Sequence, residues 1–356
     1  MSLHALLPLE TFAQTLFANH RDQMPDRNAD YWARYASLLA GLREYVYPHI
    51  NAGLSCLSKS PGIYTDHGPE HFDEVIRYAG LLLGIPTTPT IDLNPYEVYL
   101  LLCAIRLHDA GNIDGREEHE KRTFYMLEKY GGNIAHDTAE ATLISRIAEA
   151  HGGKTMSGSK DTIGELPEDG ISVAAITCRP RQVAALVRFA DEICEHASRA
   201  ARHHLTANTL PNSNKLFHLY ANSVVGATCK PGKSFKLRLA VDTQWLVSKY
   251  AAPANAEGVE TEKYFVDEIL DRISKLELER RYCNQFLIPG MQTDELEVRI
   301  ELTQAADTSR APVQVDCFEF RIPTKRGYPA AHDHWREDVP GLKGDKMAER
   351  ANQGWK

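Results

Sequence analysis

The sequence predicts a mainly α-helical fold with a small antiparallel β region near the C-terminus. Apolar residues recur at helical spacing through the first two thirds of the 356 residues. Beyond Thr206 the pattern changes to short alternating runs, of which LEVRIEL at 296–302 is the clearest. A hydrophobic content of 43% with 25% charged residues is that of an ordinary globular protein. Together these observations predict a chain with a sizeable helical core and a smaller β part.

Proline and glycine divide the N-terminal half into helices. Residues 30–53 are amphipathic and predict one helix. Gly68-Pro69 predicts the start of the next, because proline is favoured at the first helical position, and Gly84 predicts its end. Asn94-Pro95 opens a further helix that is apolar on nearly every side (YEVYLLLCAIRL). We expect this helix at the centre of the core.

Three more helices are expected before the β region. They cover residues 114–130, residues 137–150 and a long stretch from Pro180 to Leu205. The polar segment 154–169, which separates the last two, predicts a loop near the functional site.

The last third mixes strands with one helix. Residues 213–225 and 233–241 predict strands around a Lys-Pro-Gly turn, and 264–286 predicts an amphipathic helix. From Lys325 onward the chain is rich in proline, glycine and charge, which is typical of a loop. We therefore expect four segments: N-terminal helices over 1–58, a helical core over 59–206, an α+β region over 207–324 and a loop-rich tail over 325–356.

Charge and cysteine usage limit the function classes. The formal net charge of −8 argues against a surface built for long nucleic acid, while small anionic substrates remain open. The seven cysteines are scattered without a Cys-x-x-Cys pair, so we expect neither a disulfide framework nor a thiolate zinc site. A reducing compartment is the simpler interpretation.

Two further features bear on location. The start, MSLHALLPLETFAQTLF, lacks a cationic region followed by a continuous apolar segment, so we expect no secretory signal. The longest strongly apolar run, Val98 to Ile105, is too short to cross a bilayer. We expect a cytoplasmic protein with no membrane partner, and the sequence carries no indication of its oligomeric state.

An ordered series of possible metal ligands runs through the predicted helices. It reads His71, His108-Asp109, His119, His151, Asp191. Imidazole nitrogens with carboxylate oxygens suit Mn, Fe, Co, Ni or Zn, whereas dedicated Ca sites use oxygens throughout. Neighbouring helical residues point about 100° apart. His108 and Asp109 can therefore bind one ion only at the end of their helix, with other helices closing the far side.

Several residues near this series have two interpretations. A lone histidine on a helix is more often a satisfied polar group than a ligand. His67, four residues before His71, could be an acid, an outer partner or a second ligand, or simply a polar group at a helix start. Arg122, Lys154 and Arg188 could bind phosphate oxygens, or could be solvated surface charges.

The chain resembles the HD-domain superfamily of metal-dependent phosphohydrolases, whose core is a helical bundle with ligands in the order His, His-Asp, Asp. The resemblance rests on HFDEV at 71–75, LHDAG at 107–111 and LVRFAD at 186–191, and spans approximately residues 60–205. REEH at 116–119, together with LVRFAD, is most similar to the subgroup called HD-CE.

The resemblance implies an HD-type metal-binding core over 59–206. In that core His71, His108, Asp109 and Asp191 would bind one ion. In the superfamily's dinuclear members two more histidines hold a second ion while the aspartate bridges both, and His119 and His151 fit those positions. The implied cofactor is two divalent transition-metal ions, with manganese, iron, cobalt, nickel or zinc expected and magnesium a further candidate.

The implied activity is hydrolysis of a phosphate ester or anhydride by a metal-bound hydroxide, as a phosphohydrolase or phosphodiesterase. We expect a small phosphorylated substrate, a nucleotide above all, with Asp109 and His67 catalytic and with Arg122, Lys154 and Arg188 binding substrate. Two ions ~4 Å apart can hold both the attacking oxygen and a phosphoryl oxygen.

Two other functions stay open at this point. Some superfamily members with the same six ligands hold two irons and are oxygenases. The other is a nucleotide-binding regulatory module whose partner contacts are made by the C-terminal β region.

Overall fold

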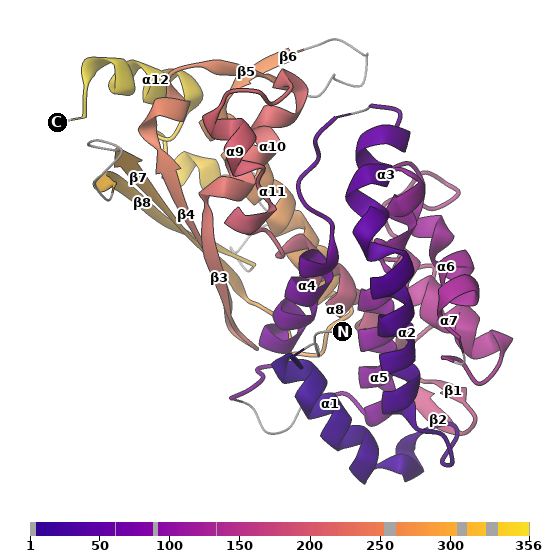
Figure 1. The fold of residues 1–356 in the computed structure, drawn as a ribbon. Helices are drawn as coiled ribbons and strands as arrows, with labels where there is room; N and C mark the ends of the chain where they lie inside the picture. Colours follow the sequence, from indigo (N-terminus) through magenta and orange to yellow (C-terminus); the bar gives the residue numbers. More distant parts are fainter. Residues whose placement is uncertain are drawn as a thin grey trace. The chain divides into compact units, whose positions relative to one another are not determined.

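The computed structural model describes residues 5–60, 62–87, 92–132, 134–252, 261–304, 312–324 and 334–355. Contacts group the chain into two compact units (Figure 1). Unit 1 comprises Met1–Pro61, His67–Cys194 and Cys283–Gln292, and unit 2 comprises Gly62–Asp66, Glu195–Tyr282 and Thr293–Lys356. The expected division into four segments stays a prediction, because a compact unit is not in itself an independently folding domain.

Unit 1 is built from helices. They are α1 (Pro8–Asn19), α2 (Tyr31–Tyr45), α3 (Ile50–Leu57), α4 (Pro69–Leu82), α5 (Pro95–Leu107), α6 (Thr123–Tyr130), α7 (Thr138–Glu149) and α8 (Pro180–Glu192). Short 3₁₀ turns occupy Arg21–Gln23, Tyr47–His49, Ala110–Asp114 and His119–Arg122. A small hairpin pairs β1 (Ile171–Val173) with β2 (Ile176–Cys178).

Helix α5 is the centre of unit 1, as its apolar sequence predicts. Every residue from Pro95 to Leu107 is buried. Asn94 begins the helix, since its side chain accepts a hydrogen bond from the N–H of Glu97 and the Glu97 carboxylate accepts one in return. α1, α2, α4, α7 and α8 all contact α5. The prediction of a central buried helix is therefore confirmed.

Three predicted helices of the first 210 residues have the wrong limits. The helix expected over 30–53 breaks after Tyr45, because Pro48 removes a backbone donor and a 3₁₀ turn replaces the α-helix there. The helix expected over 114–130 begins only at Thr123, after Gly115 turns the chain with a φ of +100°. The helix from Pro180 ends at Glu192 instead of continuing to Leu205.

Unit 2 combines helices with a four-stranded sheet. Its helices are α9 (Arg202–Thr206), α10 (Asn212–Ser223), most of α11 (Phe265–Asn284) and α12 (Gly344–Gln353). Its strands are β3 (Val224–Lys230), β4 (Ser234–Asp242), β5 (Lys249–Ala252), β6 (Thr261–Tyr264), β7 (Glu295–Gln304) and β8 (Val313–Pro323). Further 3₁₀ turns occupy Ala197–Arg199, Thr243–Leu246 and His334–Asp338.

The main sheet has the order β3-β4-β7-β8. Its outer pairs are antiparallel, as expected, but the central pair β4-β7 is parallel, with Leu237 opposite Val298. A parallel pair needs a crossover connection, and the chain between the two strands supplies one that includes α11. Buried and half-buried residues alternate along β7, and α10 packs against β3 and β4. One face of the sheet therefore belongs to the core of unit 2.

Two segments of unit 2 are helical although the sequence predicts a strand for one and a loop for the other. Residues 213–223, expected as strand, belong to α10, in which Leu216, Leu219 and Tyr220 are buried at helical spacing. Residues 344–353, expected as loop, form α12, and Trp335 before it is buried. Residues 325–333 of the expected tail lie outside the described residues. The helix predicted over 264–286 is confirmed as α11.

Among the described residues, no helix is both long enough and apolar enough to span a lipid bilayer.

Candidate metal centre

Five helical segments of unit 1 bring the predicted ligands together. His71 lies in the first turn of α4, His108 ends α5 with Asp109 directly after it, His119 opens a 3₁₀ turn, His151 follows α7 and Asp191 lies in the last turn of α8. α4 contacts α8, and α5, α7 and α8 contact one another. The cluster therefore lies inside the helical bundle, at the end of its central helix.

The first group consists of His71, His108, Asp109 and Asp191, whose donor atoms lie within 4.8 Å of one another. His71 Nε2 is 3.3 Å from His108 Nε2, and 3.4 Å from both Asp109 Oδ2 and Asp191 Oδ1. His108 Nε2 is 3.5 Å from Asp191 Oδ1. Two imidazoles and two carboxylates thus point at one common space.

The second group shares Asp109 and adds His119 and His151. Asp109 Oδ1 lies 2.9 Å from His119 Nε2 and 3.5 Å from His151 Nε2, and the two Nε2 atoms are 3.3 Å apart. Oδ2 of the same carboxylate faces the first group. The two oxygens of Asp109 are therefore divided between the two groups, which is the arrangement of a bridging carboxylate.

Hydrogen bonds fix which nitrogen of three imidazoles faces the cluster. The Nδ1 atom of His108 donates to Ile105 O (2.7 Å), and the Nδ1 atom of His151 donates to Ala148 O (2.7 Å). The Nδ1 atom of His119 lies 2.9 Å from Arg116 O. A carbonyl oxygen only accepts, so each Nδ1 carries a proton and Nε2 is the ring nitrogen turned toward the cluster. Nε2 atoms 3.3 Å apart and beside carboxylate oxygens are the donors that a bound cation would share.

The donor spacing fits a metal ion. Two donors that bind one ion at about 2.1 Å lie about 3.0–3.4 Å apart at octahedral or tetrahedral angles, close to the separations within each group. Mixed imidazole and carboxylate donors suit divalent transition metals. His108 and Asp109 are buried, whereas 27% of the Asp191 side chain is exposed. The residues present can therefore hold metal and still leave access to solvent.

Burial and the neighbouring charges shift the pKa values of four of these groups. Burial lowers the pKa of His151. Burial also opposes charge on His108, but the Asp109 and Asp191 carboxylates outweigh it and raise its pKa. For Asp109 and Asp191 burial acts to raise the pKa, yet the surrounding imidazoles hold both pKa values well below the usual range. Both carboxylates are therefore ionised, as metal ligands must be.

Outer contacts orient two of the histidines, and the sequence analysis missed them. The buried Glu120 places Oε2 3.2 Å from His119 Nδ1, and Cys194 Sγ lies 3.6 Å from His71 Nδ1. A carboxylate at the far nitrogen of a ligating histidine raises its basicity and fixes its ring. The contact between Glu120 and His119 could have been suspected, because the two residues are adjacent in the sequence. The contact between Cys194 and His71 joins residues that are distant in the sequence.

His67, predicted as a catalytic residue, also lies at the cluster. Its Nε2 is 3.9 Å from Asp109 Oδ2 and its ring lies beside that of His71. Its backbone N–H donates to Asn51 Oδ1 (3.0 Å), which anchors the residue just before α4. His67 is thus brought to the site, and its catalytic role stays a prediction.

The three predicted substrate-binding cations occupy different positions. Arg122 Nη1 donates to Gly111 O (3.0 Å) and Gly115 O (3.1 Å), which holds the loop after Asp109. Arg188 Nη1 donates to Lys160 O (3.1 Å) and Thr162 Oγ1 (2.9 Å), which holds the expected loop over 154–169. Both arginines organise loops beside the cluster, and their contact with substrate stays a prediction.

Lys154 differs from the two arginines. Its side chain is exposed, and it makes no hydrogen bond or ion pair with another residue in the described ranges. It is therefore free to meet a substrate, which stays a prediction as well.

Arg116 is a cation at the cluster that the sequence analysis did not single out. Its Nη1 lies 3.8 Å from Asp109 Oδ1. The residue begins the REEH segment that carries part of the family resemblance, but the sequence analysis assigned a role only to His119 of that segment.

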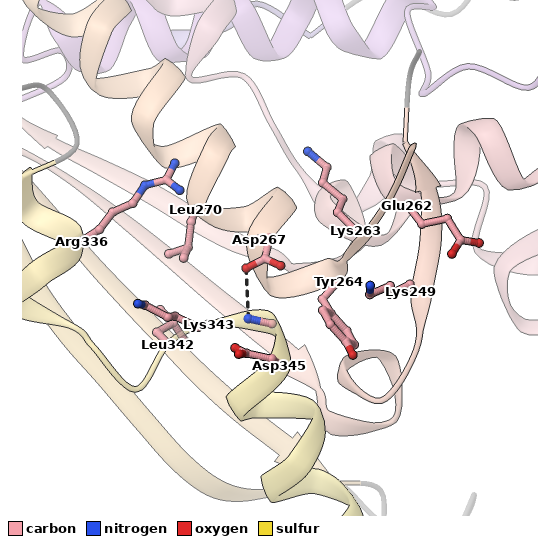
Figure 2. Close-up of a pocket in the computed structure, with 11 residues that line it drawn as sticks. Lys249, Glu262, Lys263, Tyr264, Asp267, Leu270, Arg336, Leu342, Lys343 and Asp345 are labelled. Carbon is pink, nitrogen blue, oxygen red and sulfur yellow. Dashed lines mark hydrogen bonds between the residues drawn. The ribbon is translucent and has the colours of Figure 1, made fainter. Parts of the chain in front are cut away.

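Unit 2 contains a pocket of about 420 Å³, lined by β6 and the first residues of α11 and α12 (Figure 2). Three of its charged side chains have partners within the unit: the Gly344 N–H donates to Asp267 Oδ1 (3.0 Å), and Lys263 and Arg336 both pair with Asp271. No further group of histidine, cysteine and acidic residues able to hold a metal occurs in the part of the chain that the structure describes. The candidate metal ligands among the described residues therefore all lie in unit 1.

Comparison with protein families matches residues 62–252, more than half of the chain, to the HD-CE family. This chain belongs to the HD-CE family. The match contains all six residues of the two groups, and it confirms the resemblance identified from the sequence motifs. No curated protein and no solved structure matches the chain. The chain is thus an HD-CE protein with a buried cluster of histidines and aspartates that could bind metal.

Proposed function

We propose that this protein is an HD-type metal-dependent phosphohydrolase or phosphodiesterase that hydrolyses a phosphate ester or anhydride, with a nucleotide as the substrate class. The observation that carries the proposal is the division of the Asp109 oxygens between two groups of imidazole Nε2 atoms. A pure binding module has no need of two such groups.

The proposed ligand sets follow the two groups. His71, His108, Asp109 and Asp191 would hold one ion, and Asp109, His119 and His151 would hold a second. When bound, such ions lower the pKa of water and offset the negative charge that makes phosphate esters resist nucleophiles. Four neutral imidazoles and two carboxylates leave a pair of divalent ions with net positive charge, which favours an anionic substrate.

The remaining steps belong to side chains of the protein. His67, 3.9 Å from Asp109 Oδ2, is proposed to move a proton, as acid toward a leaving group or as outer partner of the cluster. Lys154 is proposed to bind phosphoryl oxygens from the solvent side. Arg122 and Arg188 are proposed to contact substrate from loops that they also hold in place.

A metal-resolved hydrolysis screen tests the proposal. Apoprotein is reconstituted separately with Mn, Fe, Co, Ni, Zn and Mg, and each sample is tested on nucleoside mono- and triphosphates, cyclic mono- and dinucleotides and short single strands. We expect release of phosphate or nucleotide with at least one metal, and its loss in Asp109→Ala. An iron-loaded sample that consumes dioxygen and hydrolyses none of the compounds would contradict the proposal in favour of an oxygenase.

A further inference from the structure

We propose that Arg116 binds a free, negatively charged phosphoryl oxygen of the substrate on the side of the centre formed by Asp109, His119 and His151. The inference rests on the proposed function, because it needs a phosphoryl group at the centre. It assigns a substrate-binding role to a residue for which the sequence motifs and the family match indicate none.

The guanidinium of Arg116 is close to the cluster and has unused donors. Nη1 lies 3.8 Å from Asp109 Oδ1, beyond hydrogen-bond distance, and 3.5 Å from Asn112 Oδ1. In the described ranges its side chain makes no further hydrogen bond or ion pair. Its side chain is 45% exposed. A guanidinium has five N–H donors, so the single hydrogen bond to Asn112 leaves most of those of Arg116 without a protein partner in the described ranges.

The main chain of Arg116 is fixed at both ends. Its N–H donates to Ser58 Oγ (3.0 Å), and its carbonyl accepts from His119 Nδ1 (2.9 Å). The preceding residue, Gly115, has a φ of +100° that favours glycine, and Arg122 donates to its carbonyl. The same residue thus orients a histidine of the second group and presents a cation next to it.

The chemistry of the guanidinium selects an oxyanion. Arginine stays charged throughout the physiological range, and its planar fork matches two oxygens of a phosphate. Asp109 Oδ1 is already shared with His119 and His151, so it does not saturate Arg116. An anionic oxygen beside Arg116 would accept hydrogen bonds from the remaining guanidinium N–H groups, whereas without such a ligand they would be left to water.

Binding of inorganic phosphate to the metal-reconstituted protein tests the inference. Isothermal titration calorimetry is run on wild type, Arg116→Gln and Arg116→Lys, with metal content measured in each sample. The control is Lys121→Gln, which removes one positive charge from the neighbouring turn, where Lys121 is exposed and pairs with Glu118. Loss of one charge-assisted contact should weaken phosphate binding by about 10- to 100-fold.

We expect this loss in Arg116→Gln, a smaller loss in Arg116→Lys and wild-type affinity in Lys121→Gln, all at unchanged metal content. Wild-type affinity in Arg116→Gln, loss of metal together with phosphate, or a wild-type protein that binds no phosphate would each overturn the inference. The hydrolysis screen is a separate readout. Arg116-dependent phosphate binding without any hydrolysis would contradict the proposed function and leave the role of Arg116 intact.

Discussion

Gly153 lies against the Glu120 carboxylate so closely that a Cβ atom on residue 153 would overlap Glu120 Oε1. Glu120 Oε2 in turn is 3.2 Å from His119 Nδ1. The absence of a side chain at Gly153 therefore leaves room for the Glu120 carboxylate beside His119. The φ of +70° at Gly153 is a second reason for glycine at this position.

Gly153→Ala should weaken metal binding at the second group alone. The new methyl group would displace the Glu120 carboxylate from His119, and loss of an outer partner of a ligating histidine typically costs 10- to 100-fold in metal affinity, so we expect about that loss. Gly158→Ala is the matched control, because Gly158 also has a positive φ, +83°, but a Cβ there would meet nothing within 4 Å. Equal metal affinity in the two variants by competitive chelator titration would contradict the role of Glu120.

Arg106, two residues before His108, should be a major source of stability for unit 1. It is fully buried, with Nη2 2.8 Å from Glu10 Oε1, Nη1 2.6 Å from Asp73 Oδ1 and Nε donating to Tyr35 Oη (2.9 Å). Arg106→Met would remove the positively charged partner of the buried Glu10 carboxylate, and we expect a loss of about 3–5 kcal/mol in unfolding free energy by chemical denaturation at pH 7. Arg43→Met, which removes a half-exposed partner of Asp73, should cost about 1 kcal/mol or less.

The same network predicts a pH dependence. Burial acts to raise the pKa of Glu10 and of Asp73, but Arg106 outweighs it and leaves both pKa values lowered from 4.5 and 3.8. A carboxyl whose pKa is lower in the folded state stabilises the fold above its unfolded pKa, and that stabilisation is lost as the pH falls through the folded pKa. The difference in unfolding free energy between wild type and Arg106→Met should therefore shrink as the pH falls below 4.5. A difference that stays constant would argue against the ion pairs as its cause.

Lys154→Ala should slow turnover without changing metal content if Lys154 binds phosphoryl oxygens. Loss of one charge-assisted contact to a developing charge should cost roughly 2–4 kcal/mol, or about 30- to 1000-fold in rate. Lys160→Ala, an exposed lysine of the same loop, is the control. Steady-state kinetics on the substrate found by the screen gives the comparison, and wild-type rates in Lys154→Ala would assign that lysine to the solvated surface.

Helix positions in the core and the ligand series were predictable because they leave local patterns. The Asn94-Pro95 start and the continuous apolar run identify α5 from sequence alone, and the six ligands lie at or near the ends of helical segments, several of which proline or glycine marks. The converging geometry of the ligands follows from those helix ends. The outer contacts were not predictable in the same way, since Cys194 reaches His71 only through the packing of α4 and α8.

The errors have local physical causes. Residues 213–223 contain several residues with moderate strand preference, which favoured a strand in the prediction. The segment is nevertheless helical, because a helix buries one face of it in unit 2. The parallel pairing of β4 with β7 depends on a crossover that no short-range pattern encodes. The sequence left two roles open for Arg122 and Arg188, which are substrate binding and solvated surface charge. The structure shows a third role, because both arginines donate hydrogen bonds to carbonyl oxygens of neighbouring loops.

The number of bound metal ions in wild type and in three variants tests the central claim most directly. After reconstitution, elemental analysis should find two transition-metal ions per chain in wild type and one in His151→Ala, because His151 belongs only to the second group. Asp109→Ala should disturb both ions, and Asp191→Ala should lose the ion of the first group. A wild-type protein that binds no metal with Mn, Fe, Co, Ni or Zn, or equal metal content in wild type and His151→Ala, would contradict the two-ion centre bridged by Asp109.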